Sequence, residues 1–501
     1  MSNELNKREH WGSKIGFVLA AAGSAIGLGN IWRFPYITGV NGGAAFVLVY
    51  LGCVLLLGLP IMMAELTLGR RSQCDAVGTF KVIKPGTPWF LTGSLGVAAG
   101  FLILSFYSVV AGWTIGYFFE TLFGVFKRLG TAEQISNYFS IYSANPYKAV
   151  AYHALFIIFC MLIVAKGIKG GIERWCKILM PALFIVIIIL IIRSVTLKGA
   201  VAGVLFFIKP DFSKLTTASV FNALGQSFFS LSLGMGTIIT YGSYLPKRDN
   251  LAASGVMVAS LDTLIAIMAG FAIFPAVFAF GLSPDQGEGL VFRSLTNIFN
   301  IMPLGVFFGA LFFFLLTVAA LTSGISLLEV VTAYFVDEKK WSRPKAAYLI
   351  GSVIFLLGIP SALSFGVLSG FRLTGRNFFG LIENLSNNYM LPLGGVLMSI
   401  FVGYVWGSKL ALKEVEQGNP NFILGKIWIF LLRYFCPLIM IQILLFGFLG
   451  EFKSVRVQAF THQIRYYLII FDVILSSAVI IGSIIYLLLL ISKRRKAKRG
   501  G

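Results

Sequence analysis

Long apolar runs separated by short polar stretches make up most of the chain. Twelve runs are long enough to cross a bilayer, because a membrane-spanning helix needs about 20 mainly apolar residues. Their approximate bounds are 14–38, 44–69, 88–124, 149–166, 175–193, 219–243, 251–280, 305–335, 345–362, 379–406, 427–449 and 465–492. The pattern predicts an all-α membrane protein with twelve transmembrane helices, in which residues 1–501 form a single polytopic membrane domain.

The first run is interrupted by a polar, glycine-rich stretch from Gly23 to Pro35. In hydrocarbon, a break in a helix survives only where the freed N–H and C=O groups face protein, water or a bound ion. The sixth run, five spans later, contains a similar stretch rich in serine and glycine, from Gln226 to Thr237. Two broken helices at corresponding positions in two halves indicate a mid-membrane binding site in a transporter with inverted repeats.

The positions of these breaks divide the chain into two repeats and an addition. We expect one five-helix repeat over 14–193, a second over 219–406 and two additional helices over 427–492. This is a 5+5 inverted repeat with helices 1 and 6 broken. The prediction depends on the breaks alone, because no residue identity between the two halves is evident by eye.

Composition and charge exclude several classes of protein. The chain is 57% hydrophobic and 12% charged, whereas soluble domains carry about 25% charged residues. The formal charge of +21 comes from basic residues that fall on one side of the predicted spans, which is the positive-inside pattern. This pattern predicts a multi-pass protein of the cell membrane with both termini cytoplasmic, and it makes membrane lipid, not nucleic acid, the partner of the basic tail.

Side chains for covalent or metal chemistry are sparse. The five cysteines and three histidines are dispersed, without the spacing of a metal site or a catalytic nucleophile. The chain also has no nucleotide-binding loop. These features argue against an enzyme and against an ATP-driven pump.

Two carboxyl groups stand inside apolar runs, where a charge is costly and marks a partner in the bundle interior. Glu65 lies in the second run; its partner could be Arg70 near the cytoplasmic face or unwound backbone elsewhere, and the sequence leaves both open. Asp262 lies in the seventh run, which contains no lysine or arginine. A bound cation is therefore the partner of Asp262 that costs least.

Motifs at residues 7–11, 23–35, 41–43, 230–234 and 321–323 are distributed over essentially the whole chain. Together they resemble the neurotransmitter:sodium symporter family, including its bacterial amino-acid transporters. The resemblance implies the inverted-repeat fold described above and sodium-driven symport by alternating access.

The resemblance implies two sodium sites made of hard oxygen ligands, the kind that a sodium ion prefers. The first would combine the substrate carboxylate with Ala25, Asn30, Ser230 and Asp262. The second would be formed by Gly23, Ile26, Ala319, Thr322 and Ser323. Na⁺ is thus the expected coupling ion, with two ions as the expected number.

The resemblance also implies a substrate site, formed by Ser24, Ala25, Gly27, Ile103, Tyr107, Phe229, Ser232, Met235 and Leu327. Family members that carry monoamines have an aspartate where this chain has Gly27, so a substrate with its own carboxylate, an amino acid, is favoured. Met235 is an adaptable side chain and favours a bulkier or aromatic substrate over an aliphatic one.

Gates at both ends of the site follow from the same resemblance. The outer gate would pair Arg33 with Glu383, where the family has an aspartate. The inner gate would pair Arg8 with Asp337, packed by Trp11, Ser243 and Tyr244. Ala266 stands where chloride-dependent members have a serine, and Asp262 supplies a fixed negative charge, so the resemblance predicts independence of chloride.

The sequence thus predicts a sodium-coupled symporter that imports a neutral hydrophobic L-amino acid, aromatic ones included. The alternative is a substrate-gated sodium channel or a non-transporting amino-acid sensor on the same fold. Paired gates at both ends favour transport, because a pore needs only one gate. The sequence leaves open which amino acid is carried, whether both sodium ions move, whether protons return, and whether the protein is a homodimer.

Overall fold

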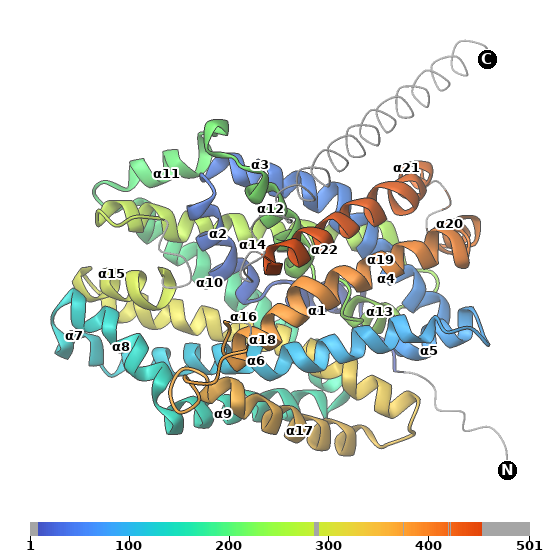
Figure 1. Cartoon of the computed structure of the whole chain (residues 1–501), viewed down its shortest axis with the longest axis horizontal. Coiled ribbons are helices and arrows are strands. Elements are labelled where there is room, and N and C mark those ends of the chain that lie inside the picture. The colour runs from blue at the N-terminus through green and yellow to red at the C-terminus, as the bar shows by residue number, and fades with distance from the viewer. Residues whose placement is uncertain (1–8, 285–289, 374, 419, 421, 453–501) are drawn as a thin grey trace, which may run out of the picture.

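The structure is a computed structural model that describes residues 9–284, 290–373, 375–418, 420 and 422–452 (Figure 1). These residues form helices and connecting loops, and no strand occurs among them. The all-helical fold agrees with the prediction from the apolar runs. The twelfth predicted span, 465–492, lies outside the described residues.

In the described part of the chain, nine helical spans are long and apolar enough to cross a membrane. They are Ala44–Ser72, Phe90–Leu122, Pro146–Val164, Ile168–Val195, Leu251–Ala279, Gly305–Asp337, Arg343–Leu363, Phe378–Val405 and Gly425–Leu445. The pair Lys14–Ala25 and Gly29–Val40, bent by 50° at its break, makes a tenth span when it is counted as one. Most bounds agree with the sequence prediction within a few residues; the fifth span begins seven residues earlier than 175, at Ile168.

The helices of the first half are α1 (Lys14–Ala25), α2 (Phe34–Val40), α3 (Ala44–Cys53), α4 (Leu59–Ser72), α5 (Ala76–Ile83), α6 (Phe90–Leu122), α7 (Val125–Leu129), α8 (Ala132–Ala144), α9 (Pro146–Val164), α10 (Arg174–Val195) and α11 (Ala200–Ile208). Those of the second half are α12 (Thr217–Ser230), α13 (Thr237–Gly242), α14 (Leu251–Ala279), α15 (Thr296–Ile301), α16 (Gly305–Asp337), α17 (Arg343–Leu363), α18 (Phe378–Asn384), α19 (Leu391–Ile400), α20 (Ser408–Glu416), α21 (Gly425–Phe430) and α22 (Cys436–Phe452). Wider π turns continue several of them, including Gly29–Arg33 before α2, Val54–Gly58 between α3 and α4, and Ile168–Glu173 before α10.

The first span is interrupted between α1 and the turn that begins at Gly29. Ser13 caps the start of α1, because its hydroxyl accepts a hydrogen bond from the Gly16 N–H. At the other end Ile26 adopts an extended conformation, with φ −72° and ψ 102°. The backbone carbonyls just before and within this break therefore lack the full set of helical partners and can bind other groups.

The sixth predicted span is interrupted between α12 and α13, where residues 231–236 form a loop. Ser232, Gly234 and Gly236 all have positive φ, at 54°, 78° and 73°. Glycine suits such positions because it has no Cβ, and at Gly234 a Cβ would also lie 2.5 Å from the Leu391 carbonyl oxygen. The glycines in this stretch thus allow the chain to leave the helical conformation between α12 and α13.

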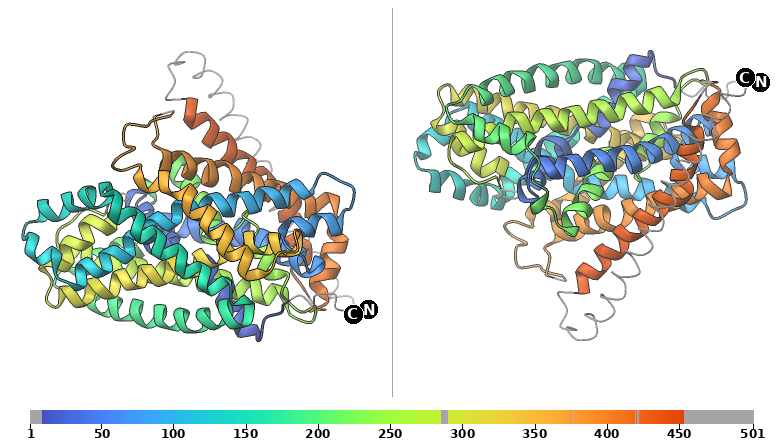
Figure 2. Two further views of the ribbon diagram at one scale, coloured as in Figure 1. Left: turned by 90° about the horizontal axis from the view of Figure 1, so that it is seen from below. Right: turned by 90° about the horizontal axis from the view of Figure 1, so that it is seen from above.

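The two ends of the molecule carry different elements. Figure 1 shows α7, α8, α11 and α15 at one end and α5, α20 and α21 at the other, with the long helices between them. The connections between long helices at the first of these ends thus contain short helices of their own. The central helix α1 packs against α10, α14 and α16, and α6 packs along α16, an arrangement that can be followed in Figure 2.

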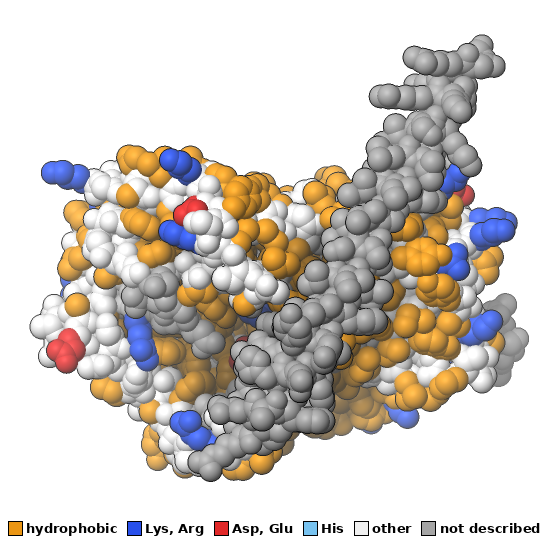
Figure 3. Space-filling model, turned by 45° about the horizontal axis from the view of Figure 1, so that its top comes forward, with side chains coloured by type: hydrophobic (Ala, Val, Ile, Leu, Met, Phe, Trp, Pro, Cys, Tyr) orange, Lys and Arg blue, Asp and Glu red, His pale blue; other side chains and the backbone are white. Residues whose placement is uncertain are grey.

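The surface has the distribution of side chains expected of a protein embedded in a bilayer. On the face drawn in Figure 3, large areas of the described surface are hydrophobic, and lysine and arginine lie toward its two ends. Exposed apolar side chains are costly in water but not in lipid. The surface therefore supports the membrane placement of the long helices.

The buried carboxyl and guanidinium groups of α4 do not pair with each other. The Glu65 carboxylate accepts a hydrogen bond from the Gly234 N–H at 2.8 Å, whereas the Arg70 Nε lies 3.0 Å from the Glu414 carboxylate. Arg70 Nη1 also donates to the Asp249 carbonyl at 2.6 Å. The Arg70 alternative for Glu65 is therefore wrong, and its partner is the unwound backbone of the sixth span.

The Arg70–Glu414 pair is expected to be important for stability, because both side chains are almost fully buried. Arg70→Met leaves the Glu414 charge buried, and among the described residues only the half-exposed Arg71, at 3.7 Å, remains as a cation partner, so the free energy of unfolding should fall by about 3–5 kcal/mol. Thermal unfolding of the protein in detergent measures the change.

Two further variants make this test specific. Arg70→Met/Glu414→Leu removes both charges and should recover most of the loss, because a buried pair can be replaced by apolar groups of similar size. Lys81→Met breaks the pair of Lys81 with Glu338, in which the lysine is 47% exposed, and should cost less than about 1 kcal/mol. A wild-type melting temperature for Arg70→Met would contradict the prediction.

Candidate functional site

The first predicted ion site lies between the break in the first span and the middle of α14. Asn30 Nδ2 donates to the Asp262 carboxylate at 2.7 Å and to the Ser230 hydroxyl at 3.0 Å. The Ser230 hydroxyl in turn donates to the Asp262 carboxylate at 2.8 Å. The structure thus brings these three predicted residues together, and Ala25 ends α1 beside the same break.

One residue at this site was not found from the sequence. The Tyr50 hydroxyl lies 3.4 Å from the Ser230 hydroxyl and 3.5 Å from the Asp262 carboxylate. Tyr50 is fully buried. In the sequence, a tyrosine in the apolar run of α3 is indistinguishable from a residue that only packs in the core. The sequence therefore carries no signal that Tyr50 contacts the predicted ion site.

The second predicted ion site lies between the same break and α16. The Ser323 hydroxyl is 3.5 Å from the Gly23 carbonyl oxygen and 3.4 Å from that of Ile26. The Thr322 hydroxyl is 3.4 Å from the Ile26 carbonyl and 3.0 Å from that of Ala319. All five predicted residues of this site are therefore gathered within a few ångströms.

The chemistry of both oxygen clusters suits one kind of cation. Their oxygens come from hydroxyls, backbone carbonyls, an amide and a single carboxylate, which are hard ligands typical of alkali and alkaline-earth ions. Among the described residues, no group of three or more His, Cys, Asp or Glu side chains could hold a metal ion. A low-charge site of this kind fits a monovalent cation such as sodium.

All nine predicted substrate residues line one small pocket between these two clusters. The pocket is bordered by Ser24, Ala25, Gly27, Gly29, Ile103, Tyr107, Phe229, Ser232, Met235, Ser323 and Leu327. Gly29 and Ser323 are additions to the predicted set. Because Ala25 and Ser323 belong also to the two predicted ion sites, the three predicted sites are contiguous.

Polar groups in the pocket lie mainly at the two helix breaks. The Leu28 N–H donates to the Tyr107 hydroxyl at 3.3 Å, and the Ser232 hydroxyl donates to the Ser24 carbonyl at 2.9 Å. A Cβ on Gly27 would lie 2.4 Å from the Ser323 hydroxyl oxygen. The walls formed by Ile103, Phe229, Met235 and Leu327 are apolar. The pocket is suited to a small molecule with a polar head and an apolar side chain.

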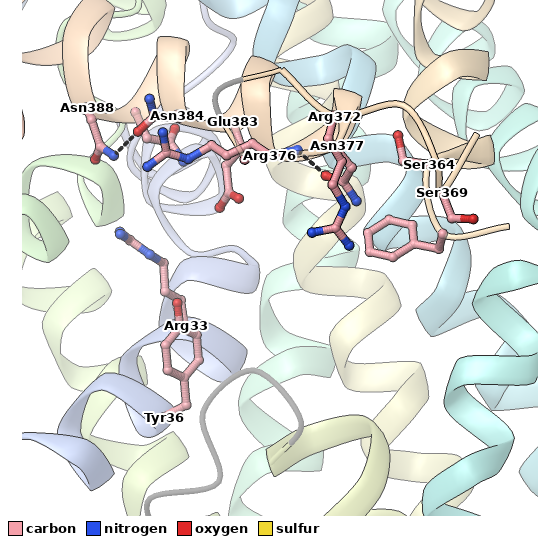
Figure 4. Close-up of a pocket in the computed structure, with 14 residues that line it drawn as sticks. Arg33, Tyr36, Ser364, Ser369, Arg372, Arg376, Asn377, Glu383, Asn384 and Asn388 are labelled. Carbon is pink, nitrogen blue, oxygen red and sulfur yellow. Dashed lines mark hydrogen bonds between the residues drawn. The ribbon is translucent and has the colours of Figure 1, made fainter. Parts of the chain in front are cut away.

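A larger polar pocket of about 630 Å³ lies beyond the small one. Figure 4 shows Arg33 and Glu383 facing this pocket from opposite sides, with Arg376 beside Glu383; Arg372 borders the same pocket. Arg33 Nη1 donates to the Gln226 side chain at 3.2 Å, and its guanidinium stands 5.0 Å from the centre of the Phe229 ring. The predicted outer-gate residues thus line one vestibule directly above the pocket wall formed by Phe229.

At the opposite end, the predicted inner-gate residues only partly come together. Arg8 lies outside the described residues. Asp337 accepts a hydrogen bond from the Asp75 N–H at 2.9 Å. The Trp11 indole donates to the Tyr241 carbonyl at 3.1 Å, and its ring packs edge-on against Tyr244. The predicted Ser243, which directly follows α13, is buried, and its hydroxyl donates to the Thr240 carbonyl.

A charged network that the sequence analysis missed closes this end. Arg343 lies 2.7 Å from the Glu329 carboxylate and 3.0 Å from that of Glu9. The Tyr244 hydroxyl donates to Glu329 at 2.7 Å, and the Ile168 N–H donates to Glu9 at 2.6 Å. Glu329 is a buried carboxylate inside an apolar run, so the rule applied to Asp262 could have found it.

Asp75 caps the start of α5 at this same end, outside the membrane-spanning segments. Its carboxylate accepts hydrogen bonds from the Val77 and Gly78 N–H groups at 2.8 and 3.3 Å. Burial, together with the nearby charge of Asp337, raises the pKa of Asp75 to about 7. The folded protein therefore holds a proton that the unfolded chain releases near the ordinary pKa of 3.8.

This raised pKa predicts the direction of a pH effect on stability. The contribution of Asp75 is fully present below about pH 4 and is lost as the pH rises to about 7. Asp75→Asn cannot ionise and keeps the capping oxygen. The melting temperature of the wild type minus that of the variant should therefore fall over this range and stay level above it. An unchanged difference between about pH 4 and about pH 8 would contradict the prediction.

The fold and site together define a class of protein. Oxygen clusters at two broken membrane helices, joined to a small pocket with polar networks at both ends, are the construction of an ion-coupled secondary transporter. The model of the sodium:neurotransmitter symporter family matches residues 8–129 and 131–492. The chain belongs to this family. The family is one of sodium-dependent transporters and not of enzymes.

Individual relatives agree with this assignment. The uncharacterised sodium-dependent transporter YhdH of Bacillus subtilis is 42% identical over 442 residues, which are 88% of this chain and 97% of that protein. The sodium- and chloride-dependent glycine transporter 1 of Xenopus laevis is 27% identical and covers 89% of this chain and 78% of its own length. The crystal structure of MhsT in complex with L-phenylalanine matches with a TM-score of 0.81 and 50% identity, covering 87% of this chain and 99% of that chain.

Proposed function

We propose that this protein is a symporter that uses two sodium ions to import a neutral hydrophobic L-amino acid by alternating access. The observation that carries the proposal is the single pocket bordered by all nine predicted substrate residues and by members of both oxygen clusters. Contiguous sites allow bound cations and a zwitterion to stabilise one another electrostatically. Binding of one then favours binding of the other, which is the basis of coupling.

We infer that the complete architecture is a twelve-helix, 5+5 inverted repeat in the cell membrane, with both termini in the cytoplasm. The breaks between α1 and α2 and between α12 and α13 support the repeat, because they fall at corresponding positions in the two halves. The network of Glu9, Arg343 and Glu329 then lies on the cytoplasmic side, and the vestibule of Arg33 and Glu383 on the outer side.

The pocket favours an amino acid over an amine. Gly27 leaves no space for a side chain, since its Cβ would meet Ser323 at 2.4 Å and the Tyr107 hydroxyl at 3.0 Å. The carboxylate must therefore come from the substrate. Met235 and the apolar wall favour a substrate with a hydrophobic, aromatic side chain. The crystal structure of the similar protein MhsT is that of a complex with L-phenylalanine.

We propose that transport is independent of chloride. Asp262 supplies a fixed negative charge among the first set of oxygen ligands, where it contacts Asn30 and Ser230. A buried anion at this place balances a bound cation without a second, diffusible anion. Uptake should therefore be the same when chloride is replaced by gluconate.

The membrane potential supplies enough energy, through two sodium ions, to accumulate an amino acid. Two sodium ions crossing ~100 mV contribute about 4.6 kcal/mol, because each charge is worth about 2.3 kcal/mol. At about 1.4 kcal/mol per decade, this supports roughly a thousandfold gradient of a neutral zwitterion.

Uptake into proteoliposomes tests the proposal. Radiolabelled phenylalanine should accumulate above its external concentration when an inward sodium gradient is present, and should equilibrate without accumulation when the gradient is absent. Sodium current without accumulation would instead indicate a substrate-gated channel. Sodium-dependent binding without either would indicate a sensor.

A further inference from the structure

A groove of about 490 Å³ lies where the chain enters α1 and α10. It is bordered by Gly12, Lys169, Glu173, Arg174, Lys177 and Ile178. None of these residues borders the substrate pocket or the outer vestibule. The groove is therefore a separate concave site at the opposite end of the protein from the vestibule.

The groove has an excess of positive charge. Lys169, Arg174 and Lys177 have exposed side chains, and only Lys177 has a carboxylate partner among the described residues, Glu173 at 2.6 Å. Glu173 is 3% exposed and also accepts hydrogen bonds from the Gly12 N–H and the Ser13 hydroxyl. Lys177 balances the charge of Glu173, so Lys169 and Arg174 remain to attract an anion.

Exposed apolar side chains place the groove at the surface of the bilayer. The membrane span of α10 begins at Ile168, and within its first turns Trp175 is 37% exposed and Ile178 is 55% exposed. Ile15, in the first turn of α1, is 69% exposed. Cations beside exposed tryptophan and isoleucine at the end of a span are typical of the headgroup region. On the topology proposed above, this region belongs to the cytoplasmic leaflet, which carries anionic lipids.

We propose that this groove is a binding site for an anionic glycerophospholipid, with its phosphate between Lys169 and Arg174 and an acyl chain against Ile178 and Trp175. Arginine offers parallel N–H donors to a phosphate, and lysine adds a point charge. Basic pockets between membrane helices on the cytoplasmic side are suited to such headgroups. A soluble phosphate would use the cations alone, whereas a lipid uses the apolar rim as well.

The site is linked to the first membrane span through Glu173. This carboxylate holds Gly12 and Ser13, and Ser13 caps α1, which leads to the carbonyls of the second oxygen cluster. A lipid that binds the groove in this arrangement stabilises the state in which the N-terminal segment is docked on α10. The lipid therefore favours the form that is closed at the cytoplasmic end.

The test uses the full-length protein in detergent and follows its thermal unfolding. The probe is dioctanoyl phosphatidylglycerol, compared with dioctanoyl phosphatidylcholine and with sn-glycerol 3-phosphate. We expect the apparent affinity for phosphatidylglycerol to exceed that for phosphatidylcholine by about tenfold or more. K169Q/R174Q should lose about tenfold of the phosphatidylglycerol affinity.

A matched control removes the same charge elsewhere. K339Q/K340Q changes two exposed lysines that follow α16 and have no ion pair among the described residues. This variant should keep the wild-type response to phosphatidylglycerol. Equal affinity for the two lipids, or an undiminished response of K169Q/R174Q, would overturn the proposal. A full response to sn-glycerol 3-phosphate would assign the groove to a soluble phosphate and overturn the lipid assignment.

A conservative variant separates a loss of lipid binding from a loss of folding. K169R/R174K keeps both charges and should keep most of the phosphatidylglycerol response, even if K169Q/R174Q proves unstable without lipid. Loss of the response in K169R/R174K would overturn the proposal. The site depends on the proposed topology but not on the transported substrate. Because these measurements require no transport, their failure would leave the proposed symport untouched.

Discussion

Asp262→Asn is expected to raise the sodium concentration needed for half-maximal uptake by about ten- to a hundredfold. Asp262 is the carboxylate of the first oxygen cluster, at 2.7 Å from Asn30 and 2.8 Å from Ser230. An interaction with a charged group contributes about 1.5–3 kcal/mol, which corresponds to this change in affinity. The measurement is a sodium titration of labelled amino-acid uptake in proteoliposomes.

Tyr50→Phe is the matched control for this variant. It removes a long hydrogen bond of 3.5 Å to the same carboxylate but keeps the negative charge. We expect its sodium requirement to change by no more than about threefold, because a bond of this length is weak. An Asp262→Asn protein that folds and keeps the wild-type sodium requirement would show that the carboxylate does not bind the ion.

Five residues that border the small pocket could be expected from the sequence to lie together, because they belong to two interrupted stretches and to motifs that resemble a known family. Ser24 and Gly27 come from one break, and Phe229, Ser232 and Met235 come from the other. A break must expose polar backbone groups to something, so its position in the sequence predicts a site.

The charged contacts outside the breaks could not be predicted in the same way. Arg70 and Glu414 are 344 residues apart, and both lie near span ends, where charges normally indicate topology. Glu9 and Arg343 are likewise far apart in the sequence and lie near span ends. Pairing of such groups depends on which span ends meet in three dimensions, and hydropathy carries no information about that.

Glu329 is a different case, because its signal was present. It stands in the apolar run of α16 and is fully buried, as Asp262 is in α14. In the same run, the hydroxyl groups of Thr322 and Ser323 were the feature that predicted an ion site. A carboxylate inside a span always requires a partner, and here the partner is Arg343.

Gly27→Ala is expected to lower amino-acid uptake by about ten- to a hundredfold. Its Cβ would lie 2.4 Å from the Ser323 hydroxyl oxygen and 3.0 Å from that of Tyr107. Overpacking of this kind costs about 1–3 kcal/mol, and it would displace two groups that border the substrate pocket and one ion site. Uptake of labelled phenylalanine, measured at saturating sodium, gives the size of the loss.

Gly52→Ala is the matched control, since a Cβ at Gly52 in α3 would meet nothing within 4 Å. It should keep wild-type uptake and wild-type melting temperature. The Gly27→Ala protein should also fold, but the addition of amino acid should no longer raise its melting temperature as it does for the wild type. Phenylalanine-induced stabilisation equal to that of the wild type would contradict the prediction, because the new methyl group would then leave substrate binding in this pocket undisturbed.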